Sequence, residues 1–219
     1  MLAFSVVLQV LLKPDRDFLK GAFMIDTGGS CGVVASADGA LEWRVWAPQA
    51  KEVDLILIDG SRRHVQPMTP EPHGHFLYRR QAVSEGQRYM FSLDKGADRP
   101  DPASRWQPDG VNQPSAVLLP SKFEWSDGKW QGVAGEDLVF YEIHVGTFTT
   151  EGTFDAIIPR LPALRDLGIT AIELMPVGQF PGTRNWGYDG VHLFAPQQSY
   201  GGPAGLQRLV NACHARGLA

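Results

Sequence analysis

The sequence contains little cysteine and no surplus of positive charge. Its two cysteines, Cys31 and Cys213, are too few and too far apart for a disulfide framework, and no Cys-x-x-Cys pair is present. We therefore expect reduced thiols in a cytosolic protein. The formal net charge is −4, from 20 basic and 24 acidic residues, so the charge gives no indication of nucleic-acid binding.

The chain also lacks an apolar run long enough to span a bilayer. The apolar leader Met1 to Leu12 is too short for that, and it has neither a basic n-region nor a cleavage motif. Three interpretations stay open for it: an added strand, an anchor, or a wrongly assigned start with Met24 as the true one. We favour the last, and we leave residues 1–40 unassigned.

Metal-ligand clusters are scarce as well. His73 and His75 form a His-Gly-His sequence, but no other ligands are evident, so we expect the pair to be incidental and predict neither a metal nor a cofactor. A chain of 219 residues that is 43% hydrophobic is typical of a soluble globular protein with room for two domains.

Residues 41–130 have the pattern of a β-sandwich. Short alternating segments recur between turn residues, which favours strands packed into two sheets. Prolines in the stretch 99–115 exclude a central strand and deter a helix, so we expect an ordered loop or linker there. The domain boundary is predicted after Trp130. The predicted strands are Leu41–Trp46, Val53–Ile58, His75–Arg80 and Gln87–Leu93, with Tyr89, Phe91 and Leu93 on one face.

Residues 131–219 alternate strands with helices. Leu138 to Val145 and Ile169 to Val177 are almost unbroken apolar runs, which indicates strands buried on both faces of a parallel sheet. Two such strand-to-helix units favour a (β/α) barrel or a doubly wound sheet. Either architecture needs more strands than these two, so the chain is predicted to end inside a domain.

Two helices are expected in this part. The first is capped by Thr153, carries apolar residues on one face and stops at Gly168. Pro159 and Pro162 predict a first turn, a bend and then the main helix. The second begins with Pro203 in its first turn and stops at Gly217. The apolar faces are Ile157, Leu161, Leu164 and Leu167 in the first helix, and Leu206, Leu209, Val210 and Cys213 in the second.

The loop Gly178 to Gly202 is the candidate site. It is longer than a plain strand-to-helix connection, and long ordered loops are usually functional. Its aromatic and polar residues suit a sugar, whose apolar faces stack on aromatic rings and whose hydroxyls need hydrogen bonds. For Phe194 and Trp186, simple packing of the loop is an equal alternative. The loop carries Phe180, Arg184, Asn185, Trp186, Tyr188, Asp189, Phe194, Gln197 and Tyr200.

Several motifs resemble the α-amylase superfamily of glycoside hydrolases. They are YEIHVGTFT (141–149), ELMPV (173–177), NWGYDGVHLFAP (185–196) and YGGP (200–203). Within it they are most similar to the trehalohydrolases, as are WRVWAP (43–48), which resembles an N-terminal immunoglobulin-like domain, and the connector DPASRWQPDGVNQPS (101–115). The resemblance implies a (β/α)8 TIM barrel, of which 131–219 would form the first two βα units. It covers roughly residues 41–219.

The resemblance also implies site residues. Tyr188 falls on the aromatic residue that stacks beneath the sugar of the scissile bond, with Trp186 and Asp189 beside it. His144 lies near the active-site mouth, although a role in barrel packing is as good an interpretation. Glu142 and Glu173 match no catalytic position, and we expect them to be hydrogen bonded inside buried strands instead.

The resemblance places the catalytic carboxylates beyond Ala219. The implied reaction is retaining hydrolysis that releases trehalose from maltooligosyl-trehalose by cleaving the adjacent α-1,4-glucosidic bond, and we expect this chain alone to be inactive. The implied partner is maltooligosyl-trehalose or another α-1,4-glucan, with no nucleic acid and no membrane. The alternatives are part of a branching or debranching enzyme, or a non-catalytic α-glucan-binding protein.

Overall fold

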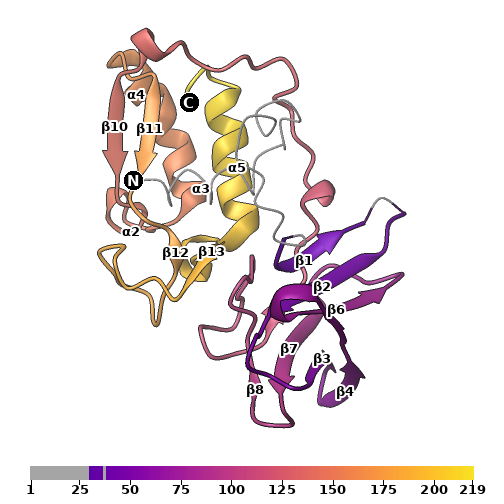
Figure 1. Cartoon of the computed structure of the whole chain (residues 1–219). Coiled ribbons are helices and arrows are strands. Elements are labelled where there is room, and N and C mark those ends of the chain that lie inside the picture. The colour runs from indigo at the N-terminus through magenta and orange to yellow at the C-terminus, as the bar shows by residue number, and fades with distance from the viewer. Residues whose placement is uncertain (1–29, 37) are drawn as a thin grey trace. The chain divides into compact units, whose positions relative to one another are not determined.

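The computed structural model describes residues 30–36 and 38–219, which form parts of two compact units, one ending at Leu119 and the other including Pro120–Ala219 (Figure 1). Each unit is considered by itself. The leader Met1 to Leu12 and the alternative start Met24 lie outside the described residues, so the interpretations of that segment stay predictions.

The first unit is built from two antiparallel sheets. One sheet has the strand order β1-β2-β6-β5, and the other has the order β4-β3-β7-β8, with β9 also paired to β7. The predicted strands are confirmed, with bounds that differ by one residue at most. The strands are β1 (Gly32–Ala35), β2 (Leu41–Trp46), β3 (Val53–Asp59), β4 (Arg62–Pro67), β5 (Thr69–Glu71), β6 (His75–Arg80), β7 (Arg88–Leu93), β8 (Asp98–Arg99) and β9 (Ser115–Ala116).

Side chains from both sheets meet in one hydrophobic core. Trp43 on β2 is fully buried, and its ring lies edge-on to that of Tyr89 on β7, with 6.2 Å between ring centroids. Tyr89 in turn meets Phe91 edge-on at 5.9 Å. Burying rings of this size stabilises the fold by about 2–3 kcal/mol each. The predicted shared face of Tyr89, Phe91 and Leu93 is confirmed, because all three pack on this core.

Five strands of this unit escaped the sequence analysis, and all but β4 have four residues or fewer. β4, with the sequence RRHVQP, is almost wholly exposed and pairs with β3 at the edge of its sheet. Charged residues at such an edge protect its open backbone groups from other chains. β1 and β5 are short edge strands of the other sheet.

The proline-rich stretch 99–115 is an ordered loop, as predicted. Buried polar groups hold it: the Tyr89 hydroxyl donates to Asp101 at 2.7 Å, and the Ser115 hydroxyl accepts the Asp101 amide at 3.0 Å. Burial, followed by the negative charge of Asp101, raises the pKa of Tyr89 well above its ordinary value.

In the second unit, β10 (Phe140–Ile143) pairs in parallel with β11 (Ala171–Leu174). Both predicted strands were too long. The first stops early because a short helix, α2 (Val145–Phe148), begins at Val145. The prediction of burial on both faces is wrong: Phe140 is 59% exposed, because β10 and β11 are each other's only strand partners in the described part. No closed barrel is formed by residues 120–219.

The first predicted helix is divided by its prolines, as expected. It comprises α3 (Phe154–Ile157), a 3-10 turn η5 (Ile158–Arg160) and α4 (Leu161–Asp166). The Thr153 hydroxyl accepts the Ala156 amide at 3.3 Å, which confirms the predicted cap. Leu167 corrects the predicted apolar face: it is 71% exposed because the helix ends one residue earlier.

The predicted loop contains a hairpin, and the second predicted helix follows it. β12 (Gly178–Gln179) pairs antiparallel with β13 (His192–Pro196), so the expected loop contains a hairpin that sequence analysis missed. The helix α5 (Gly202–His214) lies beside α3 (Figure 1), and its Arg208 forms a bidentate ion pair with Asp155. The remaining 3-10 turns are η2 (Pro72–Gly74), η3 (Pro120–Lys122), η4 (Gly135–Asp137) and η6 (Gln198–Tyr200).

Residues just after Pro120 pack on α5. Trp130 stacks on His214 with ring centroids 3.8 Å apart, and His214 Nδ1 lies 2.8 Å from an Asp127 carboxylate oxygen. The compact unit therefore begins earlier in the chain than the boundary predicted after Trp130. That boundary and the extents 41–130 and 131–219 stay predictions as domain limits.

Candidate functional site

The candidate site is a turn organised by Asn185 in the loop between β12 and β13. Its side-chain oxygen accepts the backbone amides of Gly187 and Tyr188, at 2.5 and 3.0 Å. Its side-chain nitrogen donates to the Asp189 carboxylate at 3.1 Å. An asparagine that binds backbone amides two and three residues later fixes a tight turn locally. One side chain therefore sets the course of the chain through Trp186, Tyr188 and Asp189.

His144 ties this turn to the end of β10. Its Nε2 lies 2.6 Å from the carbonyl oxygen of Asn185, and a carbonyl only accepts, so Nε2 carries the proton and donates. Its Nδ1 lies 3.2 Å from the Thr147 hydroxyl, which can donate to it in the neutral ring. The histidine is thus fixed from both sides. The structure places His144 beside the loop, while its position near an active-site mouth and a contact with substrate stay predictions.

The aromatic rings expected to meet a sugar lie in solvent. Tyr188 is 76% exposed and Trp186 is 77% exposed, and the Trp186 ring stands edge-on to His144 with 6.3 Å between centroids. The alternative that Trp186 only packs the loop does not hold, because so little of it is covered. Asp189 is also exposed, so a carboxylate accompanies the two rings.

Two glycines near the turn lie close to neighbouring side chains. Gly187 has φ +101°, and a Cβ there would lie 2.9 Å from Pro176 Cδ, so this position requires glycine. Gly146 follows His144 by two residues, and a Cβ there would lie 3.0 Å from the Tyr200 hydroxyl oxygen and 3.1 Å from His144 Cε1. Those contacts are tight, and the two side chains would have to move by a few tenths of an ångström to admit a Cβ.

The base of the loop is rigid because buried glutamines satisfy its backbone. The Gln197 side chain accepts the Phe180 amide and donates to the Gly182 carbonyl, both at 2.9 Å. The Gln179 side chain accepts the Gln198 amide at 2.8 Å. Gln197 is 1% exposed, which corrects the expectation that it offers hydrogen bonds to a sugar. Its groups are already used inside the loop.

Two of the predicted loop aromatics are structural. Phe180 and Tyr200 are buried and meet edge-on at 5.7 Å between centroids. Tyr200 also stands edge-on to His144 at 6.3 Å, and burial raises the pKa of its phenol. Phe194 is half-buried. Phe180 and Tyr200 thus contribute to the packed interior, unlike the exposed Trp186 and Tyr188.

Glu142 and Glu173 are placed otherwise than expected. They are partners across the parallel pair β10 and β11, and both are exposed with no hydrogen bond to any described residue. The prediction of internal hydrogen bonding in buried strands is wrong for both, because that sheet is uncovered on their side. They lie on the strands themselves, whereas the turn of Asn185 belongs to the following loop.

The described residues offer rings, a carboxylate and ordered backbone, but no group of three His, Cys, Asp or Glu side chains that could hold a metal ion. No helix among residues 30–36 and 38–219 is both long and apolar enough to cross a membrane. An exposed aromatic pair beside a carboxylate is suited to stacking on a sugar ring and to bonding its hydroxyls.

Residues 117–219 match the α-amylase catalytic-domain family. Over 188 residues the sequence is 46% identical to a malto-oligosyltrehalose trehalohydrolase from Saccharolobus solfataricus, which covers 86% of this chain and 33% of the relative. Residues 117–219 therefore belong to the α-amylase family. The chain is similar to the trehalohydrolases, and it spans about a third of the length of the curated relatives it matches.

Solved structures of α-amylase-type proteins share the fold. An α-amylase-like protein from Salmonella typhimurium superimposes with a TM-score of 0.81 at 43% identity, over 87% of this chain and 32% of that one. A pullulanase from Anoxybacillus sp. LM18-11, solved with maltotetraose, gives a TM-score of 0.71 at 25% identity, over 86% of this chain and 33% of that one. An amylase-like fold is therefore established for this chain.

The sequence analysis named Asn185 only as a polar neighbour and missed its organising role. A signal was present, since asparagine followed by glycine two residues later is typical of a side-chain-capped turn. The roles of Gln179 and Gln197 had no such signal. The sequence does not distinguish a buried glutamine from an exposed one, because only tertiary contacts decide which of the two it is.

Proposed function

We propose that this chain is part of a glycoside hydrolase that releases trehalose from maltooligosyl-trehalose by hydrolysing the adjacent α-1,4-glucosidic bond. Family membership and similarity to trehalohydrolases support the reaction class. The observation that carries a role for this chain is the turn of Asn185, which exposes Tyr188 and Trp186 beside Asp189. These three side chains, with His144 behind them, form the proposed substrate-binding part of the site.

We infer a finer architecture on the same basis. The two-sheet unit would be an immunoglobulin-like domain, and β10 and β11 with their helices would be the first two βα units of a (β/α)8 barrel. The parallel pairing of two strands joined through helices supports this, since such units build TIM barrels. In such a barrel, loops after the strands form the catalytic face. The turn of Asn185 follows β11 and would then belong to that face.

We further propose that the catalytic carboxylates are not in this chain. Retaining glycosidases use two carboxyl groups about 5–5.5 Å apart on opposite sides of the scissile bond. Asp189 accepts a hydrogen bond from Asn185 through one carboxylate oxygen, and Glu142 and Glu173 lie side by side on a strand pair. The chain would then bind substrate and leave the chemistry to residues that the resemblance places after Ala219.

Binding by the 219-residue chain tests the role of Tyr188. We expect maltopentaose to bind with a millimolar Kd, which corresponds to about 4 kcal/mol. Tyr188→Ala should weaken binding at least about tenfold, and Tyr188→Phe should not, because stacking uses the ring. Leu167→Ala removes a similarly exposed apolar side chain just after α4 and is the control. Equal titration curves for the wild type and Tyr188→Ala would remove Tyr188 from the site.

Activity tests the reaction itself. The 219-residue chain should release neither trehalose from maltotriosyl-trehalose nor reducing sugar from starch. A protein extended through the natural reading frame should release trehalose. Transfer of chains to make α-1,6 branches by that longer protein would replace the hydrolase by a branching enzyme. Hydrolysis by the short chain above a buffer control would show that Glu142, Glu173 or Asp189 is catalytic.

A further inference from the structure

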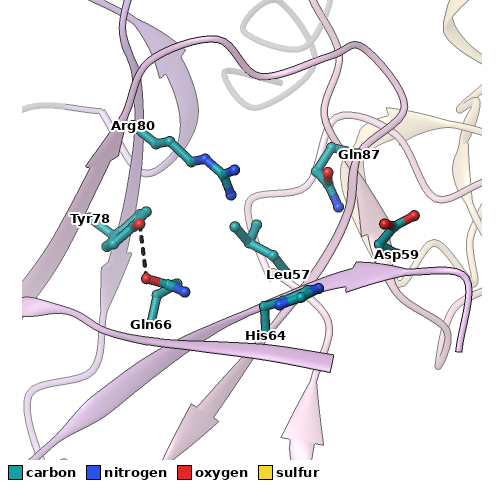
Figure 2. A pocket seen from close by; sticks show the side chains of 7 residues that line it. All are labelled: Leu57, Asp59, His64, Gln66, Tyr78, Arg80 and Gln87. Carbon is teal, nitrogen blue, oxygen red and sulfur yellow. Dashed lines mark hydrogen bonds between the residues drawn. The ribbon is translucent and has the colours of Figure 1, made fainter. Parts of the chain in front are cut away.

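The two-sheet unit has a hollow of about 390 Å³ between β3, β4 and β6. It is lined by exposed charged side chains, those of Asp59, His64 and Arg80, which Figure 2 shows around it. Exposed charges are held weakly, because water competes for them. The hollow therefore fixes no arrangement of groups for a ligand, whereas the turn of Asn185 does.

In that turn, hydrogen bonds leave the side-chain amide of Asn185 a single orientation. Its oxygen faces the backbone N–H groups of Gly187 and Tyr188, and its nitrogen faces the Asp189 carboxylate at 3.1 Å. N–H groups only donate, and a carboxylate only accepts. Rotating the amide by half a turn would set donor against donor and acceptor against acceptor. The orientation of the amide is therefore fixed by the groups around it.

The main chain of Asn185 is held from outside the turn. Its carbonyl oxygen accepts the Nε2 proton of His144 at 2.6 Å, and His144 follows β10 directly. The other nitrogen of that imidazole lies 3.2 Å from the Thr147 hydroxyl at the start of the next segment. The amide that orders the turn thus belongs to a residue that is itself tied to the end of a strand.

Asp189 keeps one carboxylate oxygen for a ligand. Its Oδ2 accepts from Asn185, whereas Oδ1 has no hydrogen-bond or ion-pair partner within residues 30–36 and 38–219. The preceding residue, Tyr188, is 76% exposed, so a ring and an oriented carboxylate oxygen lie next to each other in the chain. A sugar presents hydroxyl donors at the edge of an apolar face, which matches that pair of groups.

We propose that Asn185 is a positioning residue of the substrate-binding site. It holds the Tyr188 ring and the Asp189 carboxylate in one arrangement, in which the free Asp189 oxygen accepts from a hydroxyl of the glucose unit that stacks on Tyr188. This inference rests on the proposed function and deepens it, because it names what orders the site and which polar group reads the sugar.

Asn185→Asp tests the pair, because aspartate has the same shape and still accepts the two backbone amides. It places a second carboxylate beside Asp189, and two neighbouring carboxylates raise the pKa of one of them. At about pH 7 the two charges repel, and maltopentaose should bind at least about tenfold more weakly than to the wild type. At about pH 4.5 a shared proton bridges the pair, and the Kd should return to within about threefold of the wild-type value. A residue that only shapes the turn would give no such pH profile.

A double variant and a control separate pairing from charge. Asn185→Asp combined with Asp189→Asn restores one amide and one carboxylate in exchanged places, and the new amide oxygen at position 189 still accepts from a hydroxyl. This variant should bind within about threefold of the wild type at both pH values. Asn112→Asp adds the same charge to an exposed position of the two-sheet unit and should leave the Kd unchanged. His144 and Tyr188, the other titratable groups at the turn, are the same in all these proteins, so any change in their charge is common to the comparison.

Isothermal titration of the 219-residue chain measures each Kd, and NMR temperature coefficients of the Gly187 and Tyr188 amide protons report their hydrogen bonds without sugar. Equal Kd values for the wild type and Asn185→Asp at about pH 7 would overturn the inference. So would weak binding that persists at about pH 4.5 and in the double variant. Amide coefficients that are the same in the wild type and in Asn185→Ala would overturn it independently of any sugar. These three outcomes leave the proposed function standing, whereas a wild-type chain that binds no maltopentaose would overturn both.

Discussion

His144 Nε2 donates to the carbonyl oxygen of Asn185 at 2.6 Å, across 41 residues of chain. The bond joins the end of β10 to the turn that presents Tyr188. Since Asn185 holds that turn through its side chain, its carbonyl is the point at which the turn is fixed to the rest of the unit. His144 is therefore a positioning residue in the proposed site.

His144→Ala should weaken maltopentaose binding while leaving the fold intact. Loss of one hydrogen bond of this kind costs about 0.5–1.5 kcal/mol, or roughly two- to twelvefold in Kd. Thr147→Val is the control, because it removes the contact to Nδ1 and keeps the donor at Nε2. Isothermal titration measures both. If Thr147→Val weakened binding as much as His144→Ala, the Nε2 bond would not be what positions the turn.

Gly187→Ala should abolish binding and destabilise the unit by more than about 2 kcal/mol. The new Cβ would lie 2.9 Å from Pro176 Cδ, at a φ of +101° that L-residues rarely adopt. Gly182→Ala provides the comparison, since its φ is +77° but no atom lies within 4 Å of its Cβ. That variant should cost only about 1–2 kcal/mol of backbone strain and retain binding. Thermal unfolding and titration report the two effects, and equal losses would mean that strain alone matters.

Hydrogen exchange should be faster in β10 and β11 than in β3 and β7. Each of the first two strands has one strand partner among the described residues, and Phe140 and Glu142 are uncovered. β3 lies between β4 and β7, with Leu55 and Ile56 fully buried. Open strand edges exchange and associate readily. Protection in Phe140–Ile143 equal to that in Val53–Asp59, in a monomer, would contradict this expectation.

Only one of the two thiols should react in the folded protein. Burial raises the pKa of Cys213 to about 12, whereas Cys31 is exposed. At about pH 8 a thiol reagent should therefore modify Cys31 alone, and guanidinium chloride should release the second thiol. Rapid modification of Cys213 without denaturant would show that α5 opens.

Burial of Cys213 also makes the stability of the fold decrease at alkaline pH. Because the folded pKa of Cys213 lies above its unfolded value, its contribution is complete below the ordinary thiol pKa of about 8.5. It is then lost as the pH rises toward about 12. Tyr89, whose pKa burial also raises, acts in the same direction at higher pH. Cys213→Ala should flatten the first part of this alkaline loss in chemical unfolding curves, and an unchanged slope would contradict the assignment.

The sequence by itself determined the local elements and the family. Alternation placed β2, β3, β6 and β7, and Thr153 with two prolines fixed the divided helix before β11, because these patterns act over a few residues. The motifs around His144 and Tyr188 likewise indicated the α-amylase family, and the comparisons confirm it.

Tertiary structure decided what no local pattern encodes. Whether a glutamine bonds the backbone, as Gln197 does, or faces solvent depends on which segments fold against it. The exposure of Phe140 and Glu173 likewise depends on the cover that neighbouring strands provide, and an apolar run predicts burial without supplying that cover. The core around Trp43 and Tyr89 exists because side chains of two sheets meet there. No local pattern encodes that meeting, since the distance between strands far apart in sequence is set by packing.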